Sequence, residues 1–294
     1  MPELPEVETV RRGLAPLVEG ARIAAVTLNR ADLRFAFPAE LAQTLTGRSI
    51  ERLERRAKYL LFRLSGGQTL LSHLGMTGSY RFETFKYKEP SRYYEPRPEE
   101  KHDHLLLDLV HPQHGEMRLI YNDARRFGFI DLFGEDEESP YLKGLGPEPL
   151  SNSFNGAALA ERFAGRKAPV KAALLDQRVV AGLGNIYVSE ALHRAHIHPA
   201  LEARRLVPKR NAPGLRLEAL AAGVRAVLTE AVEAGGSTLR DFRAADGGPG
   251  YFQHSFAVYD REGAPCPTPG CGGTIRRMVQ SARSTFFCPR CQKK

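Results

Sequence analysis

All four cysteines of the chain lie within its last 29 residues, and their spacing constrains how that segment can fold. The pattern is C-x4-C, a gap of sixteen residues and C-x2-C, formed by Cys266, Cys271, Cys288 and Cys291. Two cysteine pairs separated by a gap of hairpin length are typical of a structural Zn²⁺ site with four thiolate ligands. Two disulfides are the alternative, which a reducing compartment disfavours. We expect one structural zinc ion here.

The charge balance of the chain favours a polyanionic partner. Its 294 residues include 42 Lys and Arg and 34 Asp and Glu, a net charge of +8. That excess is compatible with DNA, RNA or an acidic membrane surface. Charged residues interrupt the N-terminal segment, so it lacks the apolar core of a signal peptide, and no apolar run approaches the roughly 20 residues that span a bilayer. We expect a soluble cytosolic protein.

The apolar pattern divides the chain into two parts. Apolar residues at alternating spacings of three and four predict an amphipathic helix over residues 5–18 and a second helix over 217–231, which ends at Gly235-Gly236. Between residues 21 and 133, short apolar runs alternate with turn signals. KYLLFRL and QTLLSHL around Ser65-Gly66-Gly67 are typical of a hairpin, and the whole region predicts antiparallel strands in a sandwich.

The predicted fold class is therefore α+β, with an N-terminal helix and antiparallel β-sandwich followed by a helical domain and a four-cysteine β-hairpin. We place the sandwich domain at 1–134, a linker at 135–150 and the helical domain at 151–240. A Gly-rich loop with a return strand follows at 241–262, and the zinc finger at 263–294. The stretch from Glu83 to Lys101 is rich in Pro and charge and predicts an exposed loop.

Two segments of the second half could meet phosphate. A helical stretch is predicted to break at Gly182-Leu183-Gly184, with Asn185 as the N-cap of the next helix, and the N–H groups of such a turn suit a phosphate oxygen. Most such helix pairs are only packing units, so this signal is weak. From Cys266 to Lys294 there are six basic residues and no acid. Zinc with four thiolates carries about −2, which leaves the finger near +4 and favours nucleic acid over a merely solvated tail.

The chain begins MPELPEVE, and its first residues allow two interpretations. Proline is favoured at the first helical position, and acids in the first turn suit the helix dipole. Alternatively, once Met1 is removed, Pro2 presents a secondary amine beside the carboxylate of Glu3. Met76 in HLGMTGS and Phe127 in NDARRFG are similarly ambiguous, because each could be a core residue or a wedge that fills a gap between bases.

Eleven motifs, in order, carry a resemblance that covers nearly the whole chain. They are PELPEVE, RRAKYLL, HLGMTGS, KHDH, ARRFG, LGPEPL, GLGNIYVSEAL, HIHP, GGSTLRDF, PGYF and the cysteine module. The chain resembles the formamidopyrimidine-DNA glycosylase/endonuclease VIII family, and PELPEVE is more similar to the formamidopyrimidine branch of bacterial enzymes. The resemblance implies a helix-two-turn-helix in 151–240 and a lesion-covering loop in 241–262.

The resemblance also implies a mechanism. In the family the N-terminal proline amine attacks C1′ of the damaged nucleotide, so Pro2 would be the nucleophile and Glu3 the proton-transfer group. Lys58 resembles the lysine assigned to β-elimination and Arg283 the arginine assigned to δ-elimination. The implied activity is a DNA glycosylase and abasic-site lyase that excises 8-oxoguanine and formamidopyrimidines.

Further residues match DNA-contacting positions of the family. Met76, Arg125 and Phe127 resemble the three residues that fill the space left by the everted nucleotide, with Arg125 facing the orphaned cytosine. Contacts with the DNA backbone are implied for His73, His102, Arg166, Lys171 and Asn185. Tyr251 lies in the segment that resembles the cover over the everted base. His102 and Tyr251 also have plain structural interpretations, as a local hydrogen bond and a loop aromatic.

The implied partner is double-stranded DNA containing oxidised bases or abasic sites, bound by a cytoplasmic monomer within the bacterial nucleoid-associated pool. Zn²⁺ is the only cofactor implied. An endonuclease VIII-like preference for oxidised pyrimidines, a non-catalytic damage-binding protein and an RNA-binding zinc protein are the alternatives. The chain departs from the family in C-x4-C where C-x2-C is usual, in Ala124 where proline is common, and in its longer loop from Glu83 to Lys101.

Overall fold

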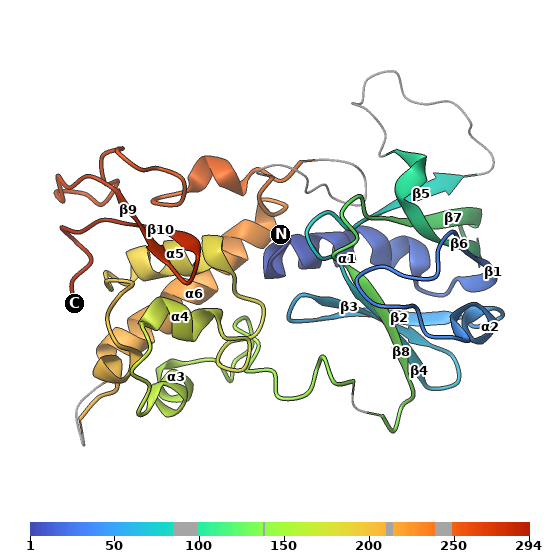
Figure 1. Cartoon of the computed structure of the whole chain (residues 1–294), viewed down its shortest axis with the longest axis horizontal. Helices are drawn as coiled ribbons and strands as arrows, with labels where there is room; N and C mark the ends of the chain where they lie inside the picture. The colour runs from blue at the N-terminus through green and yellow to red at the C-terminus, as the bar shows by residue number, and fades with distance from the viewer. Residues whose placement is uncertain (85–98, 138, 210–213, 239–248) are drawn as a thin grey trace. The chain divides into compact units, whose positions relative to one another are not determined.

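The computed structural model describes residues 1–84, 99–137, 139–209, 214–238 and 249–294 (Figure 1). The chain divides into two compact units. Unit 1 holds residues 1–143 and 235–250, and unit 2 holds residues 144–234 and 251–294. Residues 85–98 of the predicted exposed loop lie outside the described residues.

Two four-stranded antiparallel sheets form the framework of unit 1. Their strand orders are β1-β6-β7-β5 and β2-β3-β4-β8, so the predicted antiparallel sandwich is confirmed. The predicted hairpin over KYLLFRL and QTLLSHL is β3 and β4, joined through Ser65–Gly67. The strands are β1 (Arg22–Leu28), β2 (Ile50–Arg56), β3 (Tyr59–Leu64), β4 (Gln68–His73), β5 (Ser79–Thr84), β6 (Asp103–His111), β7 (Gly115–Asn122) and β8 (Phe129–Phe133).

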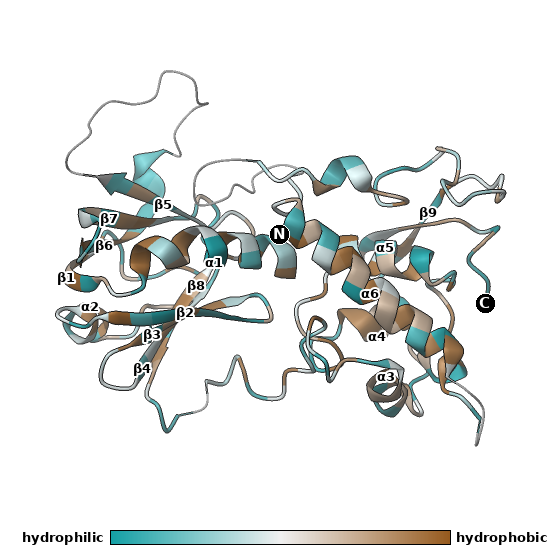
Figure 2. Ribbon diagram, turned by 180° about the vertical axis from the view of Figure 1, so that it is seen from behind, coloured by the Kyte–Doolittle hydropathy of each residue, from teal (hydrophilic) through white to brown (hydrophobic). Residues whose placement is uncertain are grey.

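Helix α1 (Leu4–Val18) confirms the predicted N-terminal helix and completes the core of unit 1. Its apolar stripe of Val7, Val10, Leu14 and Val18 is buried in one cluster with side chains from both sheets. The polar strand β2 is mostly hydrophilic in Figure 2, whereas α1 alternates between apolar and polar residues. A short helix, α2 (Leu41–Leu45), and the 3-10 helix η1 (Glu100–His102) also belong to this unit. Burial of the apolar stripe of α1 fixes the N-terminal segment of the chain to the two sheets.

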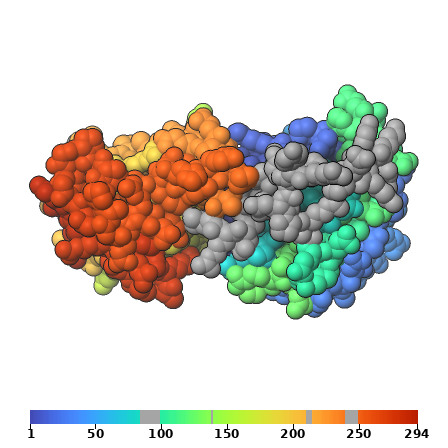
Figure 3. Space-filling model, turned by 90° about the horizontal axis from the view of Figure 1, so that it is seen from above, coloured from blue at the N-terminus to red at the C-terminus, as the bar shows by residue number. Residues whose placement is uncertain are grey.

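Unit 2 is helical and ends in a two-stranded hairpin. The predicted long helix is α6 (Leu215–Glu233), and β10 lies against α5 in Figure 1. In Figure 3 the C-terminal residues, orange to red, cover much of the visible face of this unit. The other elements are α3 (Gly156–Phe163), α4 (Val170–Leu175), α5 (Asn185–Arg194), the 3-10 helices η2 (Ala203–Leu206) and η3 (Phe252–Ser255), and strands β9 (Arg276–Gln280) and β10 (Arg283–Phe287).

Three local predictions for unit 2 need correction. Helix α4 ends at Leu175 rather than at Gly182, because the Asp176 carboxylate accepts the N–H of Arg178 and closes a turn there. The N-cap of α5 is Gly184, and Asn185 is already the first helical residue. In the described part of 241–262, residues 249–262, the chain forms η3 and loop instead of the expected return strand.

Helix α5 anchors the segment that leads into the cysteine module. The Glu190 carboxylate, buried at 1% exposure, accepts the N–H groups of Ala257, Val258 and Tyr259 at 2.8–3.0 Å. Burial raises the pKa of Glu190, and the three N–H donors act in the opposite direction. This carboxylate therefore accepts hydrogen bonds from three consecutive backbone N–H groups of the segment.

An aromatic cluster surrounds His73 at the end of β4 in unit 1. Its ring stacks on Phe129 with centroids 5.1 Å apart, and Tyr59 lies at 5.2 Å. The N–H of Gly75 donates to His73 Nδ1 at 3.1 Å, so the neutral ring carries its proton on Nε2. Burial, followed by the charges of Lys58 and Arg34, lowers the pKa of His73 from 6.5 to about 4. The ring is accordingly a neutral hydrogen-bond donor at neutral pH.

Among the described residues, no helix combines the length and the apolar character needed to cross a bilayer.

We expect Glu190→Gln to lower the free energy of unfolding by about 1–3 kcal/mol, because its amide NH₂ faces backbone donors and leaves one of them unpaired. Urea unfolding measures the change. Glu230→Gln is the matched control, since Glu230 pairs with Arg194 at a side chain that is 48% exposed, and should cost less than about 1 kcal/mol. Equal stability of Glu190→Gln and the wild type would contradict the anchoring role.

His73 should make stability fall in mild acid. Its pKa is lower in the folded than in the unfolded chain, so its contribution is complete above about pH 6.5 and is lost as pH falls toward 4. Between pH 7 and pH 5 we expect the wild type to lose about 2 kcal/mol more unfolding free energy than His73→Gln. The exposed His114, changed to Gln, is the control and should leave the pH response of the wild type intact. If the free energy of unfolding changed with pH in the same way in the wild type and in His73→Gln, the burial of a neutral ring would be contradicted.

Candidate functional site

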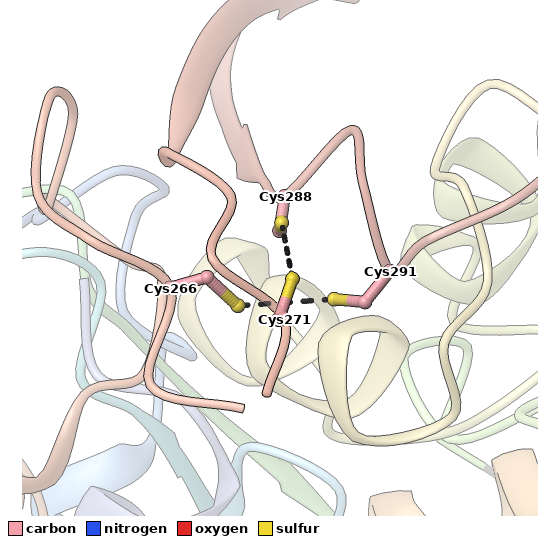
Figure 4. A group of neighbouring side chains, drawn as sticks. All are labelled: Cys266, Cys271, Cys288 and Cys291. Carbon is pink, nitrogen blue, oxygen red and sulfur yellow. Dashed lines mark hydrogen bonds between the residues drawn. The ribbon is translucent and has the colours of Figure 1, made fainter. Parts of the chain in front are cut away.

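The four cysteines converge on one point of unit 2, as Figure 4 shows. Their Sγ atoms all lie within 4.8 Å of one another, with Cys271 and Cys288 at 3.6 Å and Cys266 and Cys291 at 3.8 Å. A disulfide needs about 2.05 Å, whereas tetrahedral zinc with Zn–S bonds of about 2.3 Å places sulfurs about 3.8 Å apart. The cluster thus fits Zn²⁺, and the disulfide alternative is excluded by these distances.

Glycine is required beside this cluster. A Cβ on Gly273 would lie 2.7 Å from Cys288 Sγ, closer than a side chain can approach, and 3.3 Å from Cys271 Sγ, which is a tight contact. The knuckle therefore closes tightly around the sulfurs. Zinc held here orders the strands β9 and β10, which have few buried apolar residues of their own.

The first residues of the chain are built into unit 1. Pro2 is buried and Glu3 is 3% exposed, while Met1 is 53% exposed. The N–H of Glu3 donates to Glu6 Oε2 at 2.8 Å, as in a capping box. Glu6 Oε1 in turn accepts the N–H and hydroxyl of Ser237 at 2.8 and 3.1 Å. The segment is thus both the start of a helix and a place where Pro2 and the Glu3 side chain are buried together. The two interpretations of MPELPEVE therefore do not exclude each other.

Lys58 lies in the tight turn between β2 and β3, where Arg56 pairs with Tyr59. Ala57 takes a left-handed conformation in this turn, with φ at 53°, and Lys58 is only 8% exposed. Its charge is close enough to lower the pKa of His73. The structure therefore brings the predicted residues Lys58 and His73 together in unit 1.

Two loops of unit 1 are joined into one rigid platform by Asp123, which is fully buried. Asp123 Oδ1 accepts the hydroxyl of Thr77 at 2.5 Å, and Oδ2 accepts the N–H of Gly128 at 2.8 Å. Thr77 Oγ1 accepts the N–H of Arg125 at 3.0 Å. A Cβ on Gly75 would lie 2.2 Å from the backbone nitrogen of Gly128, so the loops are in direct backbone contact. The β4–β5 loop and the β7–β8 loop are therefore joined through both side chains and backbone.

The three predicted void-filling residues all sit on this platform. Phe127 is 45% exposed, although its size would suit a core, and Arg125 is exposed with its guanidinium 4.7 Å from the Phe127 ring centroid. Arg126 between them has φ at 54°, an uncommon conformation outside glycine. Met76 follows Gly75 on the facing loop. Exposure of a large aromatic on a rigid loop favours the wedge interpretation over the core interpretation.

The corresponding cluster of unit 2 surrounds the hairpin tip. Asn185 Nδ2 donates to the carbonyl of Ser284 at 3.0 Å, and Lys171 Nζ donates to the same carbonyl at 3.1 Å and to Thr285 Oγ1 at 2.6 Å. Arg283, the residue before this carbonyl, is exposed. Lys171 is only 1% exposed, so a direct phosphate contact would require it to leave these partners. In this structure it braces the hairpin.

The turn that precedes Arg283 is strained. Ser281 and Ala282 have φ of 49° and 58°, the two-residue hairpin geometry that normally selects Asn-Gly. Non-glycine residues in that region cost about 1–3 kcal/mol each and persist only when their surroundings hold them. Lys171 and Asn185 stabilise this turn, because both donate hydrogen bonds to the carbonyl of Ser284, the residue after Arg283.

The remaining predicted contacts are dispersed. Arg166 is partly exposed and pairs with Asp176 at 3.5 Å. Tyr251 is 62% exposed beside the start of η3. His102 is half-buried, and its carbonyl accepts the N–H of Asp123, so it belongs to the loop platform. Residues 241–248 of the predicted lesion-covering loop lie outside the described residues.

Several supporting residues were missed by sequence reasoning. Asp123 and Thr77 lie inside the quoted motifs NDARRFG and HLGMTGS, so small polar side chains within glycine-containing loops were the available signal. His104, buried at 2%, holds the Asp123 carbonyl at 2.9 Å through Nε2. The Glu6–Ser237 pair spans 231 positions and has no local signal.

Comparisons with known proteins cover almost the entire chain. The description "Formamidopyrimidine-DNA glycosylase N-terminal domain" matches residues 1–130, "Formamidopyrimidine-DNA glycosylase H2TH domain" matches 145–243, and "Zinc finger found in FPG and IleRS" matches 263–294. Formamidopyrimidine-DNA glycosylases of Rhizobium leguminosarum bv. trifolii and Rhodopseudomonas palustris are 53% and 54% identical, over 100% of both chains in each case.

Solved structures agree with these relatives. The Lactococcus lactis Fpg in complex with an abasic site containing DNA matches with a TM-score of 0.82 and 35% identity. The wild-type Lactococcus lactis Fpg with an N7-Benzyl-Fapy-dG containing DNA matches with a TM-score of 0.83 and 36% identity, and both alignments cover 100% of each chain. With its four-thiolate zinc site, the chain belongs to the formamidopyrimidine-DNA glycosylase family of DNA-repair enzymes.

Proposed function

We propose that the chain excises oxidised purines, such as 8-oxoguanine and formamidopyrimidines, from double-stranded DNA as a monomer and then cleaves the strand by β,δ-elimination. The observation that carries this proposal is the construction of the N-terminus. Pro2 is buried at the start of α1, and the backbone of Glu3 is fixed by Glu6, which Ser237 fixes in turn. An ordinary helix start needs no such chain of buried polar groups.

The proposed chemistry starts at the amine of Pro2 after Met1 has been removed. An N-terminal amine titrates near pH 8, so an appreciable fraction is neutral at pH 7. Its nitrogen attacks C1′, and the bond from C1′ to the base breaks. Glu3 passes the proton that the amine loses to the departing base and gives its own proton to O4′ as the sugar opens. The resulting iminium ion acidifies C2′–H, and loss of that proton expels the 3′ phosphate. A second elimination expels the 5′ phosphate.

The platform residues suit the space that an everted nucleotide leaves. Met76, Arg125 and Phe127 project from two loops that Asp123 locks together, so the wedge is already ordered before DNA arrives. Arg125 offers several N–H donors to the orphaned cytosine. Unstacking one base costs a few kcal/mol, which an ordered aromatic wedge offsets in part.

Phosphate binding is proposed for both units. In unit 1, His73 is a neutral donor through Nε2–H and Lys58 is a cation beside it. In unit 2, Arg283 is exposed on the hairpin and would promote δ-elimination, with Arg166 as a backbone contact. Asn185 and Lys171 contribute by holding the Ser284 carbonyl, which sets the position of Arg283. The Lactococcus lactis complexes with abasic-site and Fapy-dG DNA support this choice of partner.

We expect Glu3→Gln to separate the two proposed reactions. Excision of 8-oxoguanine opposite cytosine should fall by about 10²–10⁴-fold, because the group that transfers protons for base departure as well as for sugar opening is lost. Cleavage at a preformed abasic site, which has no base to expel, should fall far less. Denaturing gels with end-labelled duplexes measure both rates under single-turnover conditions.

Glu54→Gln serves as the control, since Glu54 only pairs with Arg63 and Arg52 at the surface of β2 and should leave both rates intact. Equal losses in both reactions for Glu3→Gln would contradict its role in base departure. The same duplex with an oxidised pyrimidine measures the substrate class, and faster excision of the pyrimidine would assign the enzyme to that class.

A further inference from the structure

The zinc knuckle of this chain holds two more residues than the C-x2-C form, and Thr268 within it brings a hydroxyl to the sulfur cluster. In the longer turn, the N–H of Cys271 donates to the carbonyl of Thr268 at 3.0 Å. The Thr268 side chain points back to the metal centre, with Oγ1 3.8 Å from Cys291 Sγ.

A histidine from outside the finger meets the same group. His193 lies on α5, and its Nε2 is 3.4 Å from Cys266 Sγ and 3.2 Å from Thr268 Oγ1. The ring is 5% exposed, so its polar edge is shielded from water. His193 is thus surrounded by the knuckle on the side of its Nε2 atom.

The chemistry of the sulfurs fixes the direction of these bonds. Thiolates that bind zinc only accept hydrogen bonds, so His193 must carry its proton on Nε2 to donate to Cys266. The same N–H reaches Thr268 Oγ1, and the Thr268 hydroxyl then has its proton available for Cys291. His193 and Thr268 therefore donate hydrogen bonds to two of the four thiolates. With zinc bound, the metal and its four thiolates carry a net charge of about −2.

We propose that His193 and Thr268 are positioning residues of the zinc site, which raise its affinity for the metal by donating hydrogen bonds to Cys266 and Cys291. The turn between Cys266 and Cys271 supplies Thr268. Because His193 belongs to α5, the same bonds tie the finger to the helix that also holds Asn185 at the hairpin. This proposal concerns metal retention and does not depend on the DNA reaction.

The test is competition for zinc between the full-length protein and a chromogenic chelator at neutral pH. His193→Phe keeps the buried ring and removes the N–H, and Thr268→Val keeps the shape and removes the hydroxyl. Each should weaken zinc binding by about 10- to 100-fold, the usual effect of removing an outer hydrogen bond to a metal ligand.

Thr268→Ser keeps the hydroxyl and should bind zinc within a few-fold of the wild type. The double variant should lose less than the product of the two single losses, because one network is involved.

His198→Phe is the matched control, since this histidine of unit 2 receives the N–H of Ala200 and packs on Phe287 rather than on a cysteine. A second measurement uses Co²⁺ in place of zinc. Loss of a hydrogen bond should move the thiolate-to-cobalt charge-transfer bands to lower energy in Thr268→Val, which decides the matter even if His193→Phe folds poorly. Zinc affinity within twofold of the wild type in Thr268→Val, with unchanged cobalt bands, would overturn the proposal.

Discussion

The buried carboxylate of Glu6 is the interaction on which the organisation of unit 1 depends. One oxygen accepts the N–H of Glu3 and the other accepts two bonds from Ser237. Gly236, whose φ is 81°, lies beside this carboxylate, and a Cβ on it would lie only 3.0 Å from Glu6 Oε1. Burial of the two oxygens is tolerated because each has a hydrogen-bond partner. The result is an N-terminus with a fixed backbone, which the proposed chemistry of Pro2 requires.

The same construction recurs around the other candidate residues. Two groups of exposed candidate side chains lie next to backbone groups that buried or partly buried side chains hold. Asp123 fixes the loops that carry Arg125 and Phe127, and Lys171 with Asn185 fixes the carbonyl next to Arg283. Rigid support of this kind reduces the entropy lost when a ligand binds, because the loops are ordered beforehand.

Much of the fold follows from local patterns in the sequence. The spacing of Val7, Val10 and Leu14 predicts α1, the glycines at 66 and 67 predict the β3–β4 hairpin, and the cysteine spacing predicts the zinc site. These succeed because helix period, turn conformation and metal geometry are each determined by neighbouring residues. The end of α4 was missed because a single side-chain bond from Asp176 decided it.

The site itself was predicted less completely. Motif resemblance located Lys171 and Asn185 but assigned them to phosphate, whereas the structure gives both a bond to Ser284, about a hundred positions away. Glu6 with Ser237, Glu190 with the segment 257–259, and His193 with Cys266 are likewise long-range pairs. A sequence shows which residues can bond, and only the folded chain shows which ones meet.

The central claim is that the amine of Pro2 forms the covalent intermediate. The most direct measurement is borohydride trapping on an 8-oxoguanine:cytosine duplex, with protein whose N-terminus is verified as Pro2, followed by peptide mapping of the adduct by mass spectrometry. The account predicts that the sugar is attached to the peptide that begins at Pro2, and that no adduct forms when Met1 is retained. An adduct on Lys58, or one that persists with Met1 in place, would contradict it.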